Sequence, residues 1–600
     1  MTAKLLGILC LGFLVGALLI AWANPARGYE LSIYASTPIL VWVLIALAFM
    51  GGVIIVVHQV ATKSYKICSH WMIGILVVLV ARVVTIYLPY IRGYVTWGGD
   101  HIEHWGMIKD ILQTGHVASD NFYPFLHTLI SQVTIITSVP ESIIINLSTA
   151  FFSILFVLSI YLLSGAILQG RATQLLATTA SAVVLFNDWE IFLRPQAWAY
   201  LLTPLVLFLF FKRTLAHNSL LVIFLILFSL VHIFGAFVVV IAFIIIGLSK
   251  MTITLISNTR NNTPFTAKLF EGFPVNATLI LSVILISWIL AFPTFNTNIR
   301  SFYMALIGIT TADIFANISI SLDKLNLDAA ETVRLWFLSR GEDVMFILLS
   351  LIAWIIIIRR IVSNRIRNLE DTTKFISILA IIVAIGLLYA TYLFGVLPSL
   401  GSLGGERFLR YTLLLTPIAA GFVLSQWLKT RYHIRFVSLG IATILIIASI
   451  LSISGLYRSP LVMRPGVQVT QMQLSGMEWS IEKKDRTIDY ARVLMPPIRF
   501  ARAILGFTEA RSRTDIKKRE TLQLPDHLNY DSYDTLGESL TADKYVVVDK
   551  YDRMVYDTVW EDVDRFDQVD FDRLGDDSTA NRLYTNGETN VWYISTQREE

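Results

Sequence analysis

Apolar runs of about 20 residues recur along the first three quarters of the chain, and a helix needs this length to cross the hydrocarbon core of a bilayer. In lipid, only a helix satisfies its backbone hydrogen bonds within one segment, so these runs predict helices. Charged residues are 15% of the 600 residues, whereas soluble proteins contain about 25%. The chain is therefore expected to be a polytopic membrane protein.

Hydropathy and flanking charge predict about thirteen spans. They are expected at residues 4–23, 38–59, 71–90, 143–168, 173–190, 196–212, 218–234, 236–249, 277–295, 343–363, 374–397, 406–427 and 435–456. The first run is long and is followed by no convincing small-residue cleavage site, so we interpret it as a retained span rather than a signal peptide.

The charges of the connecting loops predict one orientation. With the N-terminus in the cytoplasm, every inner connection contains Lys or Arg, and the outer connections hold most of the Asp and Glu, as the positive-inside rule requires. Counting segment 122–140 as a span would invert every later loop. We therefore expect an interfacial or re-entrant helix there, on the outer face. The long outer loops are then 91–142 and 296–342.

The composition changes to polar and acidic after residue 456. Residues 542–550 have strand character, and Asn586-Gly587 lies between two β-prone runs, which is the strongest short hairpin signal. We predict two domains: an all-α membrane bundle over residues 1–456, and a small extracytoplasmic α/β or β-rich domain over 457–600.

The first long outer loop opens with a cluster of ionisable residues, Asp100, His101, Glu103 and His104, directly after two glycines. A helix would place Asp100, Glu103 and His104 on one face. One interpretation is a capping box, with Asp100 as N-cap and Glu103 as its partner. Clustered ionisable groups at a bilayer edge indicate function instead. No cofactor is identified with certainty, and a divalent cation held by Asp100, Glu103 and His104 stays an alternative.

Two further clusters are expected at the same outer edge. The connection after residue 186 carries Asp188, Glu190 and Arg194, which are either substrate ligands or ordinary interface anchors. The segment GERFLRYTLLLTP (405–417) carries Arg407, Arg410 and Tyr411. Outer arginines oppose the topological bias and call for an anionic partner, and arginine binds phosphate bidentately. A phosphate role is therefore expected for at least one of Arg194, Arg407 and Arg410.

The sequence contains no P-loop, GxSxG, HExxH or CxxC motif, so nothing indicates nucleotide binding, covalent catalysis or an iron–sulfur centre. The basic residues of the membrane part are explained by topology and need no nucleic acid.

Three motifs resemble the GT-C superfamily of membrane glycosyltransferases, and in particular its protein O-mannosyltransferase-like and aminoarabinose-transferase-like members. They are the acidic residue before an amphipathic helix (Asp100 in GGDHIEHWGMIKDIL), the Tyr-Pro segment NFYPFLHTL (121–129), and the Arg-Tyr…Pro pattern of LRYTLLLTP. The likeness covers roughly residues 71–427. The C-terminal hairpin is similar to the outer domain of many archaeal members, which implies an archaeal or other prokaryotic origin. The WWDYG motif of oligosaccharyltransferases is absent from residues 457–600.

The resemblance implies a polyprenyl-phosphate-linked sugar donor, an external active site, and a glycan, lipid or protein acceptor. Asp100 would act as general base, and Arg194, Arg407 or Arg410 would stabilise the departing phosphate. His101, Glu103, His104, Asp188, Glu190 and Tyr411 are the remaining predicted substrate-binding residues. Two alternatives stay open: a transporter or flippase, against which the absence of an internal repeat argues, and a glycan polymerase or ligase, which also uses outer arginines.

Overall fold

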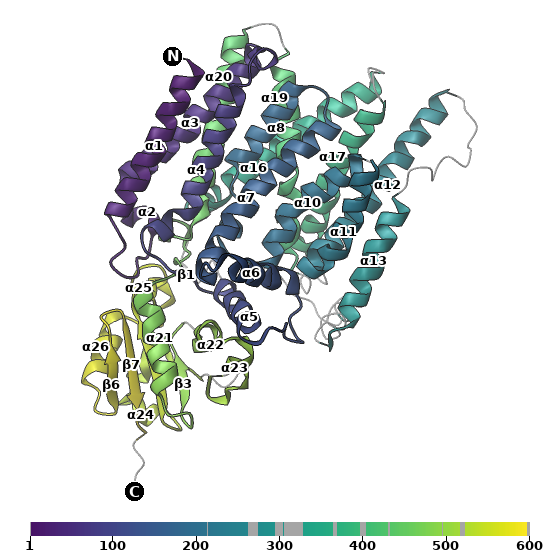
Figure 1. The fold of residues 1–600 in the computed structure, drawn as a ribbon. Coiled ribbons are helices and arrows are strands. Elements are labelled where there is room, and N and C mark those ends of the chain that lie inside the picture. The colour runs from purple at the N-terminus through teal and green to yellow at the C-terminus, as the bar shows by residue number, and fades with distance from the viewer. Residues whose placement is uncertain are drawn as a thin grey trace.

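The computed structural model describes residues 2–212, 214–261, 274–293, 300, 304, 328–363, 369–396, 404–429, 433–494, 496–516 and 522–596. Most of the predicted outer loop 296–342 lies outside these residues. The chain forms a bundle of roughly parallel helices with a smaller α/β unit at one end (Figure 1). The N-terminus lies at the end of the bundle opposite this unit (Figure 1).

All thirteen apolar segments predicted as spans contain helix. The helices are α1 (Ala3–Ala23), α3 (Ile39–Ala61), α4 (Trp71–Ile91), α7 (Glu141–Ile167), α8 (Arg171–Val183), α10 (Pro195–Lys212), α11 (Leu215–Val231), α12 (Ile233–Asn261), α13 (Val275–Leu290), α16 (Ala329–Val362), α17 (Leu369–Leu393), the consecutive α18 (Glu406–Leu414) and α19 (Thr416–Trp427), and α20 (Ile434–Leu456).

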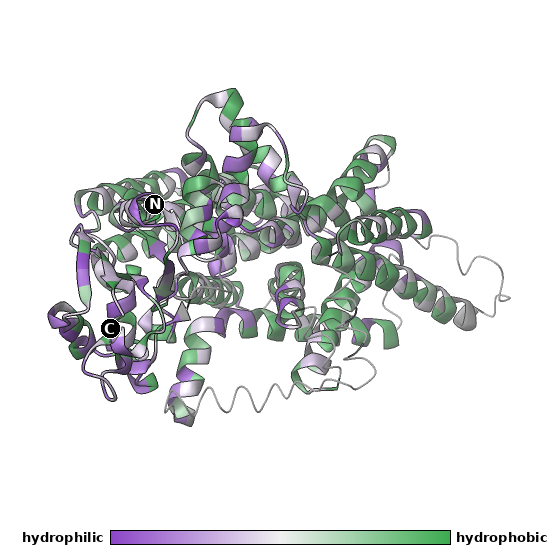
Figure 2. Ribbon diagram, turned by 90° about the horizontal axis from the view of Figure 1, so that it is seen from below, coloured by the Kyte–Doolittle hydropathy of each residue, from purple (hydrophilic) through white to green (hydrophobic). Residues whose placement is uncertain are grey.

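Ten helical segments of the described residues are long and apolar enough to cross a bilayer. The protein is therefore a multi-pass membrane protein. Helices α11 and α13 are apolar but shorter, with 17 and 16 residues. Figure 2 shows the bundle mostly in the colours of hydrophobic residues and the C-terminal unit with much more hydrophilic colour.

Three predicted span boundaries are wrong by seven residues or more. Helix α12 runs to Asn261 and not to residue 249. Helix α8 ends at Val183, seven residues before the predicted end, because residues 184–187 leave the helix. Helix α16 begins at Ala329 and not at residue 343. Its first turns are rich in charged residues that lower the hydropathy but favour helix, so hydropathy alone placed its start too late.

Two helices lie at the end of the bundle that carries the C-terminal unit. They are α5 (Asp100–Thr114) and α6 (Pro124–Thr137), which pack on each other. Figure 1 shows α6 lying across the bundle end rather than along the spans. This arrangement agrees with the surface helix predicted for residues 122–140.

The C-terminal unit is built on a five-stranded sheet in the order β4-β3-β5-β7-β6. Its strands are β3 (Asp489–Arg492), β4 (Leu522–Gln523), β5 (Lys544–Asp549), β6 (Ala580–Thr585) and β7 (Thr589–Ile594). The pairs β3–β4 and β3–β5 are parallel, whereas β5–β7 and β6–β7 are antiparallel. The predicted strand at 542–550 and the hairpin at Asn586-Gly587 are both confirmed.

The sheet is accompanied by α21 (Gln471–Lys483), α22 (Pro497–Leu505), α23 (Phe507–Ser512), α24 (Leu536–Ser539), α25 (Lys550–Thr558) and α26 (Gln568–Asp576). Helix α22 packs on α5, and here no side chain fits between the backbones. A Cβ on Gly106 of α5 would lie 2.4 Å from the Arg502 carbonyl oxygen. Asp110 of α5 also accepts hydrogen bonds from the Thr508 amide (2.8 Å) and hydroxyl (2.7 Å).

The segment between the first two spans also binds the C-terminal unit. The Tyr29 amide donates to Glu588 Oε1 (3.1 Å), and the Tyr29 hydroxyl donates to the Gly466 carbonyl (2.7 Å). A short strand, β1 (Thr96–Trp97), pairs antiparallel with β2 (Gln468–Val469). The C-terminal unit is thus held by two separate connecting segments of the helical bundle, next to the start of α5.

Candidate functional site

The site begins where β1 turns into α5. Gly99 has φ +73°, a conformation that an L side chain rarely adopts, and it is the N-cap of α5 with no side-chain cap hydrogen bond. Asp100 is the first helical residue. The capping-box interpretation of Asp100 and Glu103 is therefore wrong, because the glycine turn lets the helix begin one residue earlier.

Asp100 lies between two guanidinium groups without a tight ion pair to either. Its Oδ2 is 3.8 Å from Arg194 Nε, and its Oδ1 is 3.7 Å from Arg499 Nη2. The side chain is 57% exposed, so its oxygens remain accessible to a ligand.

Glu103 is engaged by the C-terminal unit. Its Oε1 is 3.2 Å from Arg499 Nε and 2.9 Å from Arg502 Nη1, both on α22. The structure thus uses Glu103 to hold α22 on α5, and Arg499 bridges it to Asp100.

A relay of three side chains sets the protonation of His104. Asn121 Oδ1 accepts from the Tyr123 amide (3.1 Å), which identifies it as the oxygen, and it lies 3.0 Å from His127 Nδ1. His127 Nδ1 must therefore carry the proton, and its Nε2 accepts from His104 Nδ1 at 3.0 Å. His104 Nε2 is left with a free lone pair.

Burial keeps this relay neutral. Burial, and then the charge of Arg194, lower the pKa of His104 to about 4 against the pull of Asp100. The pKa of His127 is likewise well below its usual value, first because of burial and then because of His104. At neutral pH, His104 Nε2 is thus a hydrogen-bond acceptor near Asp100.

His101 is fully buried and joins α5 to the segment that carries Arg194. Its Nδ1 accepts from the Leu193 amide at 2.7 Å, which leaves the proton on Nε2. Burial lowers the pKa of His101 to about 3, with smaller contributions from His104 and Arg194. The His101 side chain is 0% exposed and ties α5 to Leu193, so it positions this segment and is not open to a ligand.

Asp188 opens the short helix α9 (Asp188–Ile191) and gathers four guanidinium groups. Its Oδ2 is 2.9 Å from Arg458 Nη2 and 3.4 Å from Arg464 Nη2. Burial by itself raises the pKa of Asp188, but Arg194, Arg464, Arg458 and Arg410 together hold it well below its usual range. Asp188 is therefore a buried carboxylate held ionised by arginines from three separate parts of the chain.

Glu190 does not face this group. Its side chain is fully buried in an ion pair with Arg82 of α4, at 2.5 Å. Arg82 also donates to the Ser153 hydroxyl and to the carbonyl oxygens of Ser181, Ala182 and Val184. Glu190 thus anchors α9 to the bundle.

The predicted residues of α18 take different positions. Arg410 is 6% exposed, and its guanidinium carbon lies 5.8 Å from the Trp189 ring centroid. Arg407 packs over Phe234 at 5.7 Å. Tyr411 is buried against Tyr200, with ring centroids 5.3 Å apart. Arg410 therefore belongs to the group around Asp188, whereas the Tyr411 ring is part of the core.

Two arginine nitrogens of this group are buried without a hydrogen-bond partner among the described residues: Arg194 Nε and Arg410 Nη1. Buried polar groups are normally satisfied, and an unpaired buried cation is costly. An anionic ligand between them would supply the missing acceptors.

Sequence reasoning missed several residues of the site. Helix α16 contributes Glu342 and Asp343, which are 1% and 6% exposed, and Asp343 pairs with Arg340 at 3.2 Å. The C-terminal arginines were also missed, and no local pattern marks them. Arg82 did carry a signal, since an arginine inside an apolar run is expensive and calls for a partner.

The described residues contain one group of three His, Asp or Glu side chains whose ligand atoms lie within 4.8 Å of one another: His527, Asp567 and Asp570, in the C-terminal unit. Asp100, Glu103 and His104 do not form such a group, since Glu103 is directed to α22. Asp567 and Asp570 form a capping box at α26, which accounts for their proximity.

No family model matches the chain, and no curated protein does. Among solved structures, the oligosaccharyltransferase of Archaeoglobus fulgidus in the apo form is similar at 14% identity and a TM-score of 0.47, over 79% of this chain and 69% of that one. The structure of the Archaeoglobus fulgidus enzyme AglB in complex with an inhibitory peptide and a dolichol-phosphate is similar at 15% identity and a TM-score of 0.48, again over 79% of this chain and 69% of that one. ArnT from Cupriavidus metallidurans bound to undecaprenyl phosphate is similar at 10% identity and a TM-score of 0.37, over 88% of this chain and 99% of that one. Likenesses this distant do not decide the family.

Proposed function

We propose that the protein is a GT-C-type membrane glycosyltransferase that takes a sugar from a polyprenyl-phosphate-linked donor and transfers it to a glycan, lipid or protein acceptor on the outer face of the membrane. One observation carries the proposal. An accessible carboxylate, Asp100, lies beside an arginine group that includes two unsatisfied buried nitrogens, on Arg194 and Arg410. A base next to an anion site is what this reaction needs.

The reaction displaces a phosphate from a sugar. The acceptor hydroxyl oxygen forms a bond to the anomeric carbon from one face while the bond from that carbon to the phosphate oxygen breaks on the other, so the centre inverts. Asp100 takes the hydroxyl proton as general base. The polyprenyl phosphate leaves with the electron pair of the broken bond, and its charge is stabilised by arginine.

Charge supports a phosphate as the ligand of the arginine group. Arg194, Arg410, Arg458 and Arg464 all act on Asp188, and although Arg410 also acts on Asp343, Arg194 Nε and Arg410 Nη1 keep no hydrogen-bond acceptor among the described residues. Guanidinium forks bind phosphate oxygens in pairs. His104 Nε2 would accept a hydrogen bond from a sugar hydroxyl in this arrangement.

The proposed orientation follows from the charges of the loops. The N-terminus is cytoplasmic and the C-terminal unit is extracytoplasmic, on the side where Asp100 lies. Since the two similar solved proteins are named with dolichol-phosphate and undecaprenyl phosphate, these lipids are the first carriers to test.

The test is sugar transfer by the purified full chain from radiolabelled polyprenyl-phosphate sugars to candidate acceptors. Asp100→Asn should lower turnover by about 10²–10⁴-fold, the usual contribution of a general base, with an unchanged elution profile. Asp120→Asn is the matched control, because this carboxylate lies in the same loop and pairs with Arg511. Full activity of Asp100→Asn would refute the assignment. Activity only with lipid-pyrophosphate glycans would favour a polymerase or ligase instead.

A further inference from the structure

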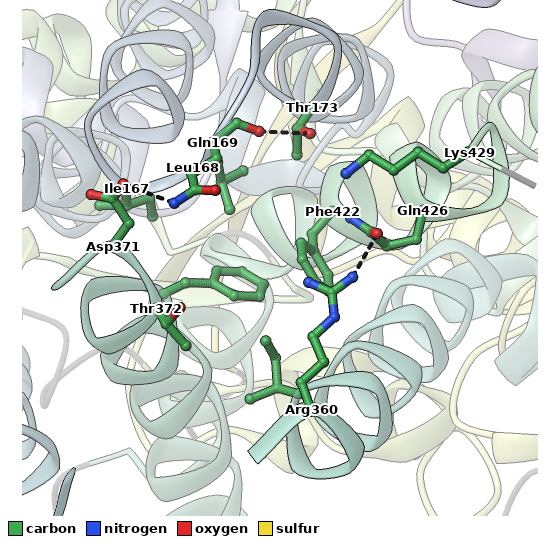
Figure 3. Close-up of a pocket in the computed structure, with 12 residues that line it drawn as sticks. Ile167, Leu168, Gln169, Thr173, Arg360, Asp371, Thr372, Phe422, Gln426 and Lys429 are labelled. Carbon is green, nitrogen blue, oxygen red and sulfur yellow. Dashed lines mark hydrogen bonds between the residues drawn. The ribbon is translucent and has the colours of Figure 1, made fainter. Parts of the chain in front are cut away.

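A second polar cavity lies at the opposite end of the bundle, far from Asp100. It has a volume of about 90 Å³ and is formed by the α7–α8 connection, the end of α16, the start of α17 and the end of α19. Figure 3 shows Arg360, Phe422, Gln426 and Lys429 on one side of it and Asp371 on the other. We call it the distal pocket.

Arg360 is held in position at the wall of the distal pocket. Its guanidinium carbon lies 5.3 Å from the Phe422 ring centroid, and its Nη2 donates to Gln426 Oε1 at 2.7 Å. Among the described residues, the Arg360 side chain makes this one hydrogen bond. A guanidinium has five N–H donors, so the fork keeps further donors for a ligand.

Lys429 adds a second positive charge beside Arg360. Its side chain has no ion pair or hydrogen bond within the described part of the chain. Burial, and then the charge of Arg360, lower the pKa of Lys429, as expected for two cations held close together. Asp371 lines the opposite side of the pocket and makes no ion pair with either cation in the described part of the chain; it accepts from Gln169 Nε2 at 3.1 Å and lies 3.9 Å from Lys374 Nζ.

Membrane topology alone explains why cations lie at this end of the bundle, but it does not explain why two of them line one pocket. Lys and Arg favour helix C-termini and cytoplasmic loops, and the neighbouring Arg359 shows that ordinary case, since it is exposed and does not line the cavity. Arg360 and Lys429 instead both line a polar pocket that opens to the surface. Its 90 Å³ suits a single small anionic group and is far below the roughly 300 Å³ of pockets for whole small ligands.

We propose that the distal pocket binds the phosphate group of a phosphate ester, with Arg360 and Lys429 as its cationic ligands. Arg360 is two residues from the end of α16, and Lys429 follows the end of α19 by two residues, so both lie where a span meets water. Basic pockets between spans at this depth bind lipid head groups. The source is thus an anionic phospholipid of the adjacent leaflet or a soluble phosphate. The inference is independent of the proposed glycosyl transfer.

Native mass spectrometry of the full chain tests the proposal. Phosphatidylglycerol is the probe, and dioleoylglycerol, which lacks phosphate, is the control lipid. The wild type should bind one molecule of phosphatidylglycerol more tightly than the other phosphatidylglycerol molecules that associate with its surface. The Arg360→Gln/Lys429→Gln variant should lose at least about tenfold in that affinity, since each cation near a lipid head group contributes about 1 kcal/mol.

Arg359→Gln is the matched control and should retain the tight site. Inorganic phosphate is added in a second arm. Displacement of the lipid by millimolar phosphate would support the anion site and make soluble phosphate its source, whereas no displacement would support the lipid. Equal binding of phosphatidylglycerol by wild type and double variant, or equal binding of dioleoylglycerol by the wild type, would overturn the proposal. Unchanged elution and melting of the double variant show that it is folded.

Discussion

The buried ion pair between Arg82 and Glu190 gives the sharpest test of how the site is held in place. Both side chains are fully buried, and their closest N···O distance is 2.5 Å. Glu190→Gln keeps the shape of the side chain and one acceptor oxygen but removes the negative charge. Arg82 is then an uncompensated cation inside the membrane bundle.

The loss of stability in Glu190→Gln depends on the hydrogen bonds that Arg82 still makes. Removing one partner of a buried ion pair typically destabilises by about 3–5 kcal/mol. The guanidinium still donates to Ser153, Ser181, Ala182 and Val184, which places the cost near the lower end, about 3 kcal/mol. For a chain of 600 residues this corresponds to a fall of about 2 °C in the apparent Tm.

The assay is thermal unfolding of the purified full chain in detergent, at one heating rate because such unfolding is often irreversible. Glu331→Gln is the matched control. Glu331 pairs with Arg334 at 3.4 Å on the same helix, and both side chains are exposed, so its loss should cost at most about 0.5 kcal/mol.

Equal Tm values for Glu190→Gln and Glu331→Gln would refute the reasoning. A second comparison separates charge from packing. In Arg82→Met/Glu190→Met both charges are removed, and such replacements are often neutral or stabilising. If this double variant were as unstable as Glu190→Gln, the cost would lie in packing and not in the unpaired charge.

Three more predictions concern α5. Gly106→Val should push α22 off α5, because even a Cβ would lie 2.4 Å from the Arg502 carbonyl oxygen. Limited trypsin digestion should then release the C-terminal unit faster than in the wild type. Gly12→Val is the control, because a Cβ there meets open space, and it should not change the rate of digestion. Asn121→Ala should lower sugar transfer by up to about tenfold, since one hydrogen bond fixes the relay to His104; unchanged transfer would argue against that relay. His101 has a pKa of about 3 when folded against 6.5 as reference, so its contribution to stability is complete above about pH 6.5 and is lost as the pH falls toward 3. His101→Gln should therefore flatten the fall of Tm between pH 7 and 4, and a Tm profile identical to the wild type would contradict this.

Local signals predicted most of the fold. Each segment that hydropathy predicted as a span contains a helix, because a run of apolar residues marks a spanning helix without reference to the rest of the chain. The helix at Pro124–Thr137 is short and lies across the bundle end (Figure 1), in agreement with the surface helix predicted there, and Asn586-Gly587 correctly placed a hairpin. Helix ends were predicted less well, since charged helix formers at the start of α16 resemble a loop by hydropathy.

The site was predictable only in part. Asp100, Asp188, Arg194 and Arg410 are brought together at one end of the bundle. Glu190 is part of the structural framework instead, because its charge is matched by Arg82, more than a hundred residues earlier. The contact of Arg499 with Asp100 joins residues almost four hundred apart, and no periodicity or motif connects them.

The C-terminal unit changes what the membrane bundle can do. It brings Arg499 to Asp100 and, through the segment that leads into it, Arg458 to Asp188. The bundle alone would leave Asp100 beside a single cation, Arg194, and would remove the closest positive charges from the buried Asp188. A polar domain that was only attached to the end of the bundle would make no contacts with these two carboxylates. The positive charge around both carboxylates therefore depends on the C-terminal unit and on the segment that leads into it, and Arg499 and Arg502 of α22 join that unit to α5.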